Sequence, residues 1–257
     1  MLSHSEVNSF LEEKYRLYAS PSFIEHDPIQ IPHRYSAKED IEIAGFLTAS
    51  LAWGQRTMII RSAGRLLDRM GESPYEFILN ATNNEIEALS DFYYRTFKGT
   101  DCVVFLRSLQ RIYLQHDGLE RVFTEGFQEA ETVASAISYF RNVFTGDSFP
   151  KRSEKHISNP QSGSAAKRLN MYLRWMVRPK TEGVDFGIWR EIPPSALMLP
   201  LDVHTSRVAR ALGLLSRKQN DWKAVEEVTQ NLRTFDPTDP VKYDFALFGL
   251  GAFEKFN

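Results

Sequence analysis

The chain of 257 residues contains a single cysteine, Cys102, and no long run of apolar residues. One cysteine can neither close an internal disulfide nor supply the thiolates of an iron–sulfur cluster. No apolar stretch approaches the roughly 20 residues that span a bilayer, and the first residues lack the basic and apolar regions of a signal peptide. We therefore expect a cytoplasmic protein that holds no iron–sulfur cluster and enters no membrane.

The sequence also lacks a sustained alternation of apolar and polar residues, which is the pattern of half-buried strands. Apolar residues recur instead at every third and fourth position, for example over residues 40–52, 57–70 and 222–233. The fold class is therefore predicted to be all-α. Because the length lies near the upper limit for one hydrophobic core, we expect a single domain over residues 1–257. Within it, a lobe made from both chain ends and a middle helical lobe of about residues 73–150 are expected.

Histidine is scarce as well, with six residues in the chain. His116, His156 and His204 show none of the spacings that are typical of a metal site. We expect neither a metal ion nor a cofactor.

Charge is distributed unevenly along the chain, although the net charge is only −2. Between Lys151 and Lys218 there are 13 Lys or Arg residues and 5 Asp or Glu residues, so this segment carries +8 and the remainder −10. A basic segment on an acidic body can face an anionic polymer such as nucleic acid. A solvated basic surface would explain the same pattern.

A turn with glycine and serine precedes a predicted basic amphipathic helix over residues 165–177. Its apolar stripe lies beside four cations, Lys167, Arg168, Arg174 and Arg178. A neighbouring cation such as Arg168 can lower the pKa of Lys167, and a neutral lysine amine can attack a carbonyl-like carbon. A lysine in this place can also simply contact phosphate or solvent.

Asp202 is the strongest candidate for a catalytic carboxylate. Pro200 forces an extended approach, and Asp202 stands at or just before the start of a predicted helix over residues 202–213, with Val203, Val208, Ala211 and Leu212 facing inward. Helix-terminal amides keep such an acid ionised, which suits a group that stabilises a developing cation. An ordinary helix N-cap has the same sequence pattern.

A third polar feature is the glycine-containing turn after residue 52, which presents Gln55 and Arg56. A glutamine on such a turn could fill a gap in a base stack, and it could equally belong to a plain interhelix turn. Three tryptophans have two interpretations as well, because a Trp ring stacks well on a base but also fills a core. They are Trp53, Trp175 and Trp189.

Three segments together resemble the helix-hairpin-helix DNA glycosylases, the superfamily of endonuclease III and the 8-oxoguanine glycosylases. They are Leu51-Ala52-Trp53-Gly54-Gln55-Arg56-Thr57, Leu199-Pro200-Leu201-Asp202-Val203-His204-Thr205 and Lys242-Tyr243-Asp244-Phe245-Ala246-Leu247-Phe248-Gly249. Gln55 falls on the family's stack-entering glutamine, and Asp202 matches its motif aspartate. The resemblance also extends to an uncharacterised bacterial family of this group. It implies a two-lobed helical fold with a divergent helix-hairpin-helix.

The usual catalytic lysine of the superfamily, about 18 residues before the aspartate, has no counterpart here, because position 184 is valine. Lys167 lies 35 residues before Asp202 instead. The segment from Lys167 to Tyr172 is similar to the lysine-bearing helix of archaeal 8-oxoguanine glycosylases. The resemblance thus implies Asp202 and Lys167 as the catalytic residues.

The function that the resemblance implies is excision of a damaged base from duplex DNA, with 8-oxoguanine as one candidate. Such an enzyme flips the base out of the stack, and a lysine nucleophile would add strand cleavage at the abasic site. We expect a monomer that contacts DNA through Gln55, Arg56, Lys151, Gln161, Gly163, Ser164, Arg168, His204 and Arg207. The resemblance does not decide between an enzyme and a protein that only binds nucleic acid. A non-catalytic nucleic-acid-binding module on the same fold is the alternative, and a protein-interaction role is the third hypothesis.

Overall fold

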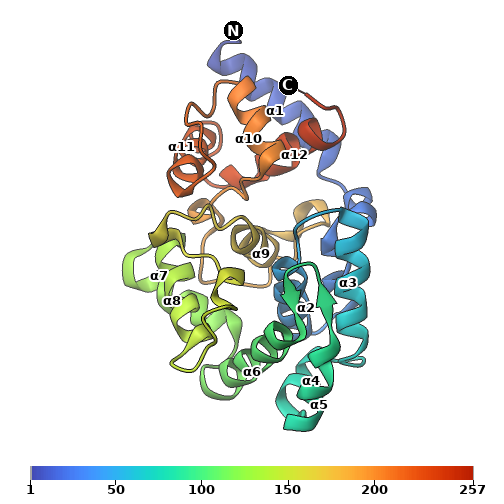
Figure 1. Cartoon of the computed structure of the whole chain (residues 1–257). Helices are drawn as coiled ribbons and strands as arrows, with labels where there is room; N and C mark the ends of the chain where they lie inside the picture. The colour runs from blue at the N-terminus through green and yellow to red at the C-terminus, as the bar shows by residue number, and fades with distance from the viewer. Residues whose placement is uncertain (1, 257) are drawn as a thin grey trace. The chain divides into compact units, whose positions relative to one another are not determined.

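The structure is a computed structural model that describes residues 2–256, and it is mostly helical, which confirms the all-α prediction (Figure 1). The chain forms two compact units. The terminal unit comprises Met1–Glu25 and Pro160–Asn257, and the central unit comprises His26–Asn159. The expected middle lobe began near residue 73, whereas the central unit also takes in the two helices before that position. Within residues 2–256 no helix is long and apolar enough to cross a membrane.

In the terminal unit, helix α12 (Asp244–Ala252) packs against both α1 (His4–Tyr18) and α10 (Val203–Ala211) (Figure 1). Two glycines permit this close approach. A Cβ on Gly249 would lie 2.2 Å from the Tyr18 ring, and one on Gly251 would lie 3.0 Å from the backbone oxygen of His204. The remaining helices of this unit are α9 (Lys167–Val177) and α11 (Trp222–Arg233).

Helix boundaries in the terminal unit are set by capping side chains. Ser3 and Glu6 form a reciprocal capping box at α1, and Asp221 accepts a hydrogen bond from the Ala224 N–H at α11. Asp239 stands at the N-cap position of the segment Pro240–Tyr243 that leads into α12, but its side chain makes no capping hydrogen bond. Its carboxylate instead accepts hydrogen bonds from Arg178, a buried guanidinium that needs a charged partner.

The central unit is built on the buried helix α2 (Lys38–Ser50), which is followed by α3 (Arg56–Asp68). Aromatic rings fill its core, with Phe46 in contact with Phe105, Phe140 and Phe144. The pair α7 and α8 pack side by side (Figure 1). The further elements are α4 (Pro74–Asn80), α5 (Asn83–Glu87), β1 (Tyr93–Tyr94), β2 (Phe97–Lys98), α6 (Gly99–Gln115), α7 (Leu119–Ala130) and α8 (Val133–Thr145).

Helix α9 forms where the basic amphipathic helix was predicted, but its burial is more complete than that pattern indicates. Every residue from Leu169 to Val177 is buried, and so is Arg178. Arg174 and Arg178 lie inside the unit because carboxylates from other segments neutralise them. Trp175 and Trp189 are also buried and belong to the core.

Helix α10 is rotated relative to the expected orientation. Val203 is 63% exposed and Ala211 is exposed, although both were predicted to face inward. Residues three or four apart share a helix face. The buried face therefore carries Thr205, Val208, Ala209 and Leu212, whereas Val203 and Ala211 fall on the opposite face.

Candidate functional site

Asp202 lies at the N-terminus of α10 in an extended backbone conformation, as the sequence predicts. Its Oδ1 accepts a hydrogen bond from the Thr205 N–H at 2.9 Å. Its other oxygen has no hydrogen-bond partner among residues 2–256, and the side chain is half-buried. The structure thus provides a carboxylate that is fixed by one oxygen and open at the other.

Asp244, the first residue of α12, is a buried carboxylate on which the charge of Asp202 acts. Its carboxylate is buried and accepts a hydrogen bond from Arg174 Nη1. Burial raises the pKa of Asp244 to about 6, Arg174 opposes that rise and the charge of Asp202 adds to it. The charge of Lys167 also acts on this pKa, in the lowering direction. Asp202, Lys167 and Arg174 therefore all act electrostatically on Asp244, and we call these four residues the aspartate cluster.

Lys167 begins α9 and is half-buried. Its Nζ lies 3.6 Å from the sulfur of Met171, and no carboxylate forms a salt bridge with it among the described residues. A thioether is a weak acceptor. The ammonium group consequently keeps most of its hydrogen-bonding capacity for another partner.

The backbone that leads into Lys167 is unusual. Ala166 has φ +46, a left-handed conformation that residues with a Cβ adopt at a cost, and it is fully buried. Asn170 stabilises this turn, because its Nδ2 donates to the carbonyl oxygen of Ala165 and its backbone N–H donates to that of Ala166. The position of Lys167 therefore depends on a strained but braced turn.

Two buried acceptors lie one helical turn beyond the candidate catalytic residues. Asn170 Oδ1 stands three residues after Lys167, and Thr205 Oγ1 stands three residues after Asp202. Neither atom has a hydrogen-bond partner in the described part of the chain. An unsatisfied buried polar atom typically costs about 1–3 kcal/mol. Both atoms therefore remain able to accept a hydrogen bond from a group outside the described chain.

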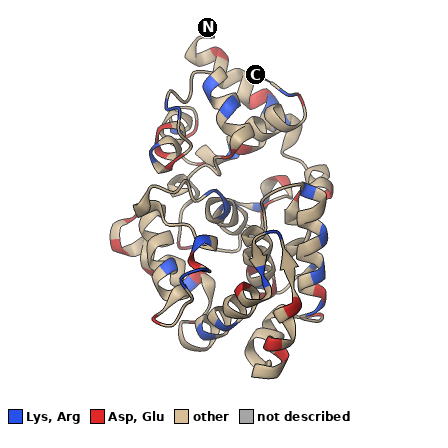
Figure 2. Cartoon of the chain, in the orientation of Figure 1, with Lys and Arg blue, Asp and Glu red and all other residues tan. Residues whose placement is uncertain are grey.

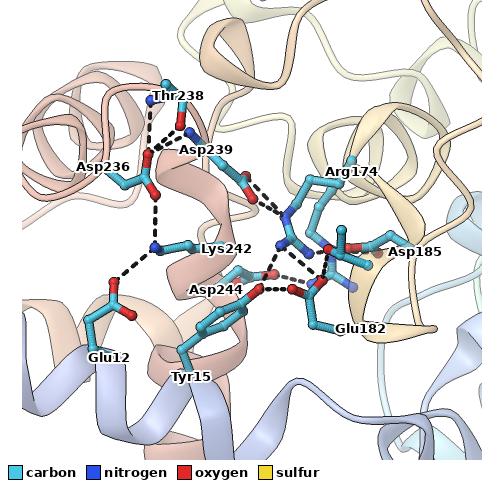
Figure 3. Close-up of polar contacts among 12 residues, drawn as sticks. Glu12, Tyr15, Arg174, Glu182, Asp185, Asp236, Thr238, Asp239, Lys242 and Asp244 are labelled. Atoms are coloured by element: carbon cyan, nitrogen blue, oxygen red, sulfur yellow. Dashed lines mark hydrogen bonds and ion pairs between the residues drawn. The ribbon is translucent and has the colours of Figure 1, made fainter.

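Beside the aspartate cluster lies a network of buried ion pairs (Figure 3). Asp185 accepts from Arg174 Nε at 3.2 Å and from Arg178 Nη1 at 2.7 Å, and Arg178 Nε also donates to Asp239 at 2.9 Å. Although burial alone would lower the pKa of Arg178, the carboxylates of Asp185 and Asp239 raise it. These arginines are structural, because every charge in the network has a counter-charge within the unit.

The network continues to the N-terminal helix through Lys242. Its Nζ lies 2.8 Å from both Glu12 and Asp236 (Figure 3). Hydrogen bonds from Lys242 and Thr238 hold the pKa of Asp236 below its ordinary value, although burial by itself would raise it. This end of the network fastens α1 to the segment that precedes α12.

The other predicted DNA-contacting residues of the terminal unit are distributed over two segments. Gln161, Gly163, His204 and Arg207 are exposed, whereas Ser164 and Arg168 are half-buried. The loop is ordered, because the Gly163 N–H donates to the Pro160 oxygen and Ser164 forms a bridge with Asp221. Burial lowers the pKa of Arg168 to about 10.

In the central unit, Gln55 lines an open pocket of about 570 Å³ between α3 and the β1–β2 hairpin. Three cations line it as well, Arg61 and Arg65 from α3 and Arg95 from the hairpin turn. Figure 2 shows basic residues along α3. We call this the arginine pocket. Arg56 is half-buried at the start of α3, and Lys151 is exposed in a turn before Glu154.

None of the three pocket arginines forms an ion pair within the described part of the chain. Arg65 donates to the backbone oxygen of Tyr93 at 3.4 Å, and Arg61 and Arg95 have no hydrogen-bond partner there. The remaining lining consists of Gln55, Met58, Ser62, Tyr93 and Tyr94, so no acidic residue lines the pocket. All of the charged side chains that line it are therefore positive.

Sequence reasoning missed Asp244 and the hairpin residues. Asp244 could have been found, since it is the single charged residue in an otherwise apolar segment, Asp244-Phe245-Ala246-Leu247-Phe248-Gly249-Leu250, and a lone acid in such a segment must be paired or functional. Tyr93 and Arg95 gave no such signal, because two-residue strands are too short for a periodic pattern.

Comparison with known families identifies the class to which the chain belongs. A family model described as a protein of unknown function, DUF2400, matches residues 27–253. The chain is a member of this DUF2400 family. Searches of the curated proteins and of the solved structures gave no match.

Proposed function

We propose that the chain is a cytoplasmic, DNA-binding protein that cleaves the N-glycosidic bond of a damaged base, with either water or a lysine amine as the nucleophile. The observation that carries this proposal is the Asp202 carboxylate, which one oxygen anchors at a helix N-terminus while the other is open. Lys167 supports it, because its Nζ has only a sulfur partner and its charge acts on Asp244, as that of Asp202 does.

Asp202 would act on the charge that develops when the bond to the base breaks. Such cleavage passes through an oxocarbenium-like state, and a fixed, ionised carboxylate next to the sugar stabilises it without reorganisation. The fixed oxygen of Asp202 keeps the open oxygen in one place during the reaction.

Lys167 gives the reaction two possible courses. If its amine attacks C1′, a C–N bond forms while the base departs with the electrons of the glycosidic bond, and proton loss and ring opening give an imine. If water attacks under the control of Asp202, the product is an abasic site. Base flipping precedes either course, because the glycosidic carbon is not reachable within the stack.

The predicted DNA contacts retain their roles in this proposal. Gln55 would fill the space of the extruded base, and Arg56 and Lys151 would contact phosphates. In the terminal unit Gln161, Gly163, Ser164, Arg168, His204 and Arg207 would set the register on the backbone without reading sequence. Binding by these contacts should weaken steeply with salt.

Excision assays test the proposal directly. Labelled duplexes that carry 8-oxoguanine, uracil, thymine glycol or alkylated purines are incubated with the protein and then treated with alkali, which cuts at every abasic site. The variant is Asp202→Asn, and its matched control is Asp221→Asn, because both aspartates cap a helix with nearly the same backbone angles. Asparagine caps helices as well as aspartate does.

Excision that is lost in Asp202→Asn and kept in Asp221→Asn supports the glycosylase. Excision that survives in Asp202→Asn contradicts the role of this carboxylate. If the unaltered protein binds DNA in a salt-sensitive manner and excises nothing, the chain is a nucleic-acid-binding module and Asp202 is a helix cap.

Borohydride trapping separates the two courses. An imine on Lys167 should give a covalent adduct with lesion-bearing DNA, and Lys167→Gln should abolish it. Lys223→Gln is the control, since Lys223 is an exposed lysine of the same unit. Excision without any adduct would remove the lysine from the mechanism and leave the water reaction.

A further inference from the structure

The arginine pocket of the central unit is a group of cations that takes no part in the reaction proposed for Asp202 and Lys167. It brings three guanidinium groups, Arg61, Arg65 and Arg95, to one open volume of about 570 Å³ with no carboxylate among its lining residues. Like charges placed together repel one another, and no carboxylate of the described chain forms an ion pair with any of these three arginines. An anion from solution can therefore pair with them without displacing a carboxylate.

The arrangement on α3 presents these cations on one face. Met58, Arg61 and Arg65 follow one another at spacings of three and four, whereas the helix buries Ile59, Ala63, Leu66 and Leu67. A guanidinium offers a planar fork of donors that matches a phosphate group. The face is therefore suited to successive phosphates rather than to a single small anion.

The hairpin adds an aromatic surface to the cations. Side chains alternate along β1, so Tyr94 is buried while Tyr93 is 61% exposed. Tyr94 fixes the hairpin, because its hydroxyl donates to the Trp53 backbone oxygen at 2.6 Å. Met58, from the other wall, is 45% exposed. The exposed ring of Tyr93, beside cations that form no ion pair, provides a surface on which a base can stack.

Gly54 allows Arg95 to reach the pocket. It has φ +103, and a Cβ at this position would lie 2.6 Å from Arg95 Nη1. The Arg95 side chain therefore lies directly over the turn that presents Gln55. Arg95 itself has φ +54, so a residue with a long side chain takes the strained corner of the hairpin.

We infer that the arginine pocket binds an unpaired, single-stranded segment of nucleic acid, with phosphates on Arg61, Arg65 and Arg95 and a base stacked on Tyr93. Bases in a duplex hide their faces from such a ring, whereas an unpaired base offers one. An acidic peptide would neutralise the cations but would leave the ring and Met58 uncovered. The inference deepens the proposed function by naming a second kind of ligand, but it does not need catalysis by Asp202.

Fluorescence anisotropy with a 5′-labelled 12-nucleotide dT strand tests the inference. The variant Arg61→Gln/Arg65→Gln should bind at least tenfold more weakly. Its control is Arg107→Gln/Arg121→Gln, which removes two arginines of the same unit that are also exposed but are paired with Glu87 and Glu125. The control should bind as the unaltered protein does. Equal losses in both double variants would reduce the pocket to a general charge effect and overturn the inference.

Salt dependence gives a second measure of the same contacts. For a single strand, log K against log salt has a slope of about −0.7 per phosphate contact. Three contacts predict a slope of about −2, and the Arg61→Gln/Arg65→Gln variant should retain about −0.7. An unchanged slope in this variant would show that the phosphates lie elsewhere.

The stacking contact has its own pair of variants. Tyr93→Ala should weaken binding by on the order of tenfold, and Tyr93→Phe should leave it unchanged, because the ring carries the contact. An abasic strand of the same length should bind the unaltered protein as weakly as dT binds Tyr93→Ala. If poly-glutamate or free dTMP binds as tightly as the dT strand, the assignment to a strand is wrong.

The failure of this inference can be told apart from that of the proposed function. Asp202→Asn should bind the undamaged dT strand with unchanged affinity, because Asp202 takes no part in the pocket. Excision with no strand binding would overturn only the pocket, and strand binding with no excision would overturn only the glycosylase.

Discussion

The arginines of the terminal unit and those of the arginine pocket face opposite electrostatic conditions. Arg174 and Arg178 are buried, and each is bonded to at least two carboxylates. The pocket arginines are exposed and have no carboxylate partner in the described chain. A buried guanidinium must be paired to be tolerated, whereas an exposed cluster can remain unpaired because water solvates it until a ligand arrives. Pairing thus distinguishes arginines that hold the fold from arginines that are available for binding.

The net charge of a sequence segment does not show which of its cations are exposed to an anion. The basic segment between Lys151 and Lys218 includes Arg174 and Arg178, whose charges are directed inward. The three arginines of the pocket lie outside that segment altogether. Net charge along the chain therefore located a basic region but not the side chains that are free to meet an anion.

The largest difference in stability between the two sets of arginines is expected from a substitution of Arg178. Arg178→Met leaves Asp185 and Asp239 without their guanidinium, so the free energy of unfolding should fall by about 3–5 kcal/mol. Arg61→Met, in the pocket, should change it by less than about 0.5 kcal/mol. Urea unfolding followed by circular dichroism measures both. Similar values for the two variants would show that pairing does not distinguish the two sets of arginines.

A second prediction concerns the pH dependence that Asp244 imposes on the terminal unit. Burial raises its pKa to about 6 from an ordinary value of 3.8, so the folded chain holds a proton that the unfolded chain releases. Its stabilising contribution is present below about pH 4 and is lost as pH rises through about 6. Relative to Asp244→Asn, the unaltered protein should lose on the order of 2–3 kcal/mol between pH 4 and 7.

Asp221 provides a control of opposite sign for this experiment. The hydrogen bond from Arg217 lowers the pKa of Asp221 to about 2, so its contribution is present above about pH 4 and is lost as pH falls toward 2. Unfolding curves of Asp244→Asn and Asp221→Asn at several pH values should therefore diverge from the unaltered protein in opposite directions. Parallel curves for Asp244→Asn would mean that Asp244 is ionised throughout.

The sequence patterns predicted helices well where one face is apolar and caps are local. The apolar recurrence over residues 57–70 corresponds to the buried residues Ile59, Ala63, Leu66 and Leu67 of α3, and Asp202 caps α10 at the predicted helix start. Helix α1 could have been predicted too, because Ser3 and Glu6 have the spacing of a capping box. Caps and apolar periodicity can be predicted because all the residues that form them lie within a few positions of one another in the sequence.

Pairing over long sequence separations could not be predicted in the same way. Arg174 looked like a surface cation because its partners Asp185 and Asp244 lie 11 and 70 residues away along the chain. The arginine pocket likewise combines α3 with a hairpin some 30 residues later. Helical periodicity predicts which residues share a face but not what covers that face.

A smaller effect tests how Arg95 is held in the pocket. Gly54→Ala places a Cβ against the Arg95 guanidinium, whereas Gly71→Ala, at a similar positive φ, meets no atom within 4 Å. Both should lose about 1 kcal/mol of stability from the strained backbone. Only Gly54→Ala should also weaken binding of the dT strand, by a few fold, in the anisotropy assay. Equal affinities would mean that Arg95 takes no part in binding.

The smallest expected change separates the two roles of Asp202, as a helix cap and as a reactive carboxylate. Asp202→Asn should leave the free energy of unfolding within about 0.5 kcal/mol of the unaltered value, whereas Asp202→Ala should lower it by about 1 kcal/mol. Both variants should lack excision activity, because both remove the carboxylate charge. Activity that follows stability instead, being kept in Asp202→Asn and reduced in Asp202→Ala, would assign Asp202 to the scaffold alongside Arg174 and Arg178.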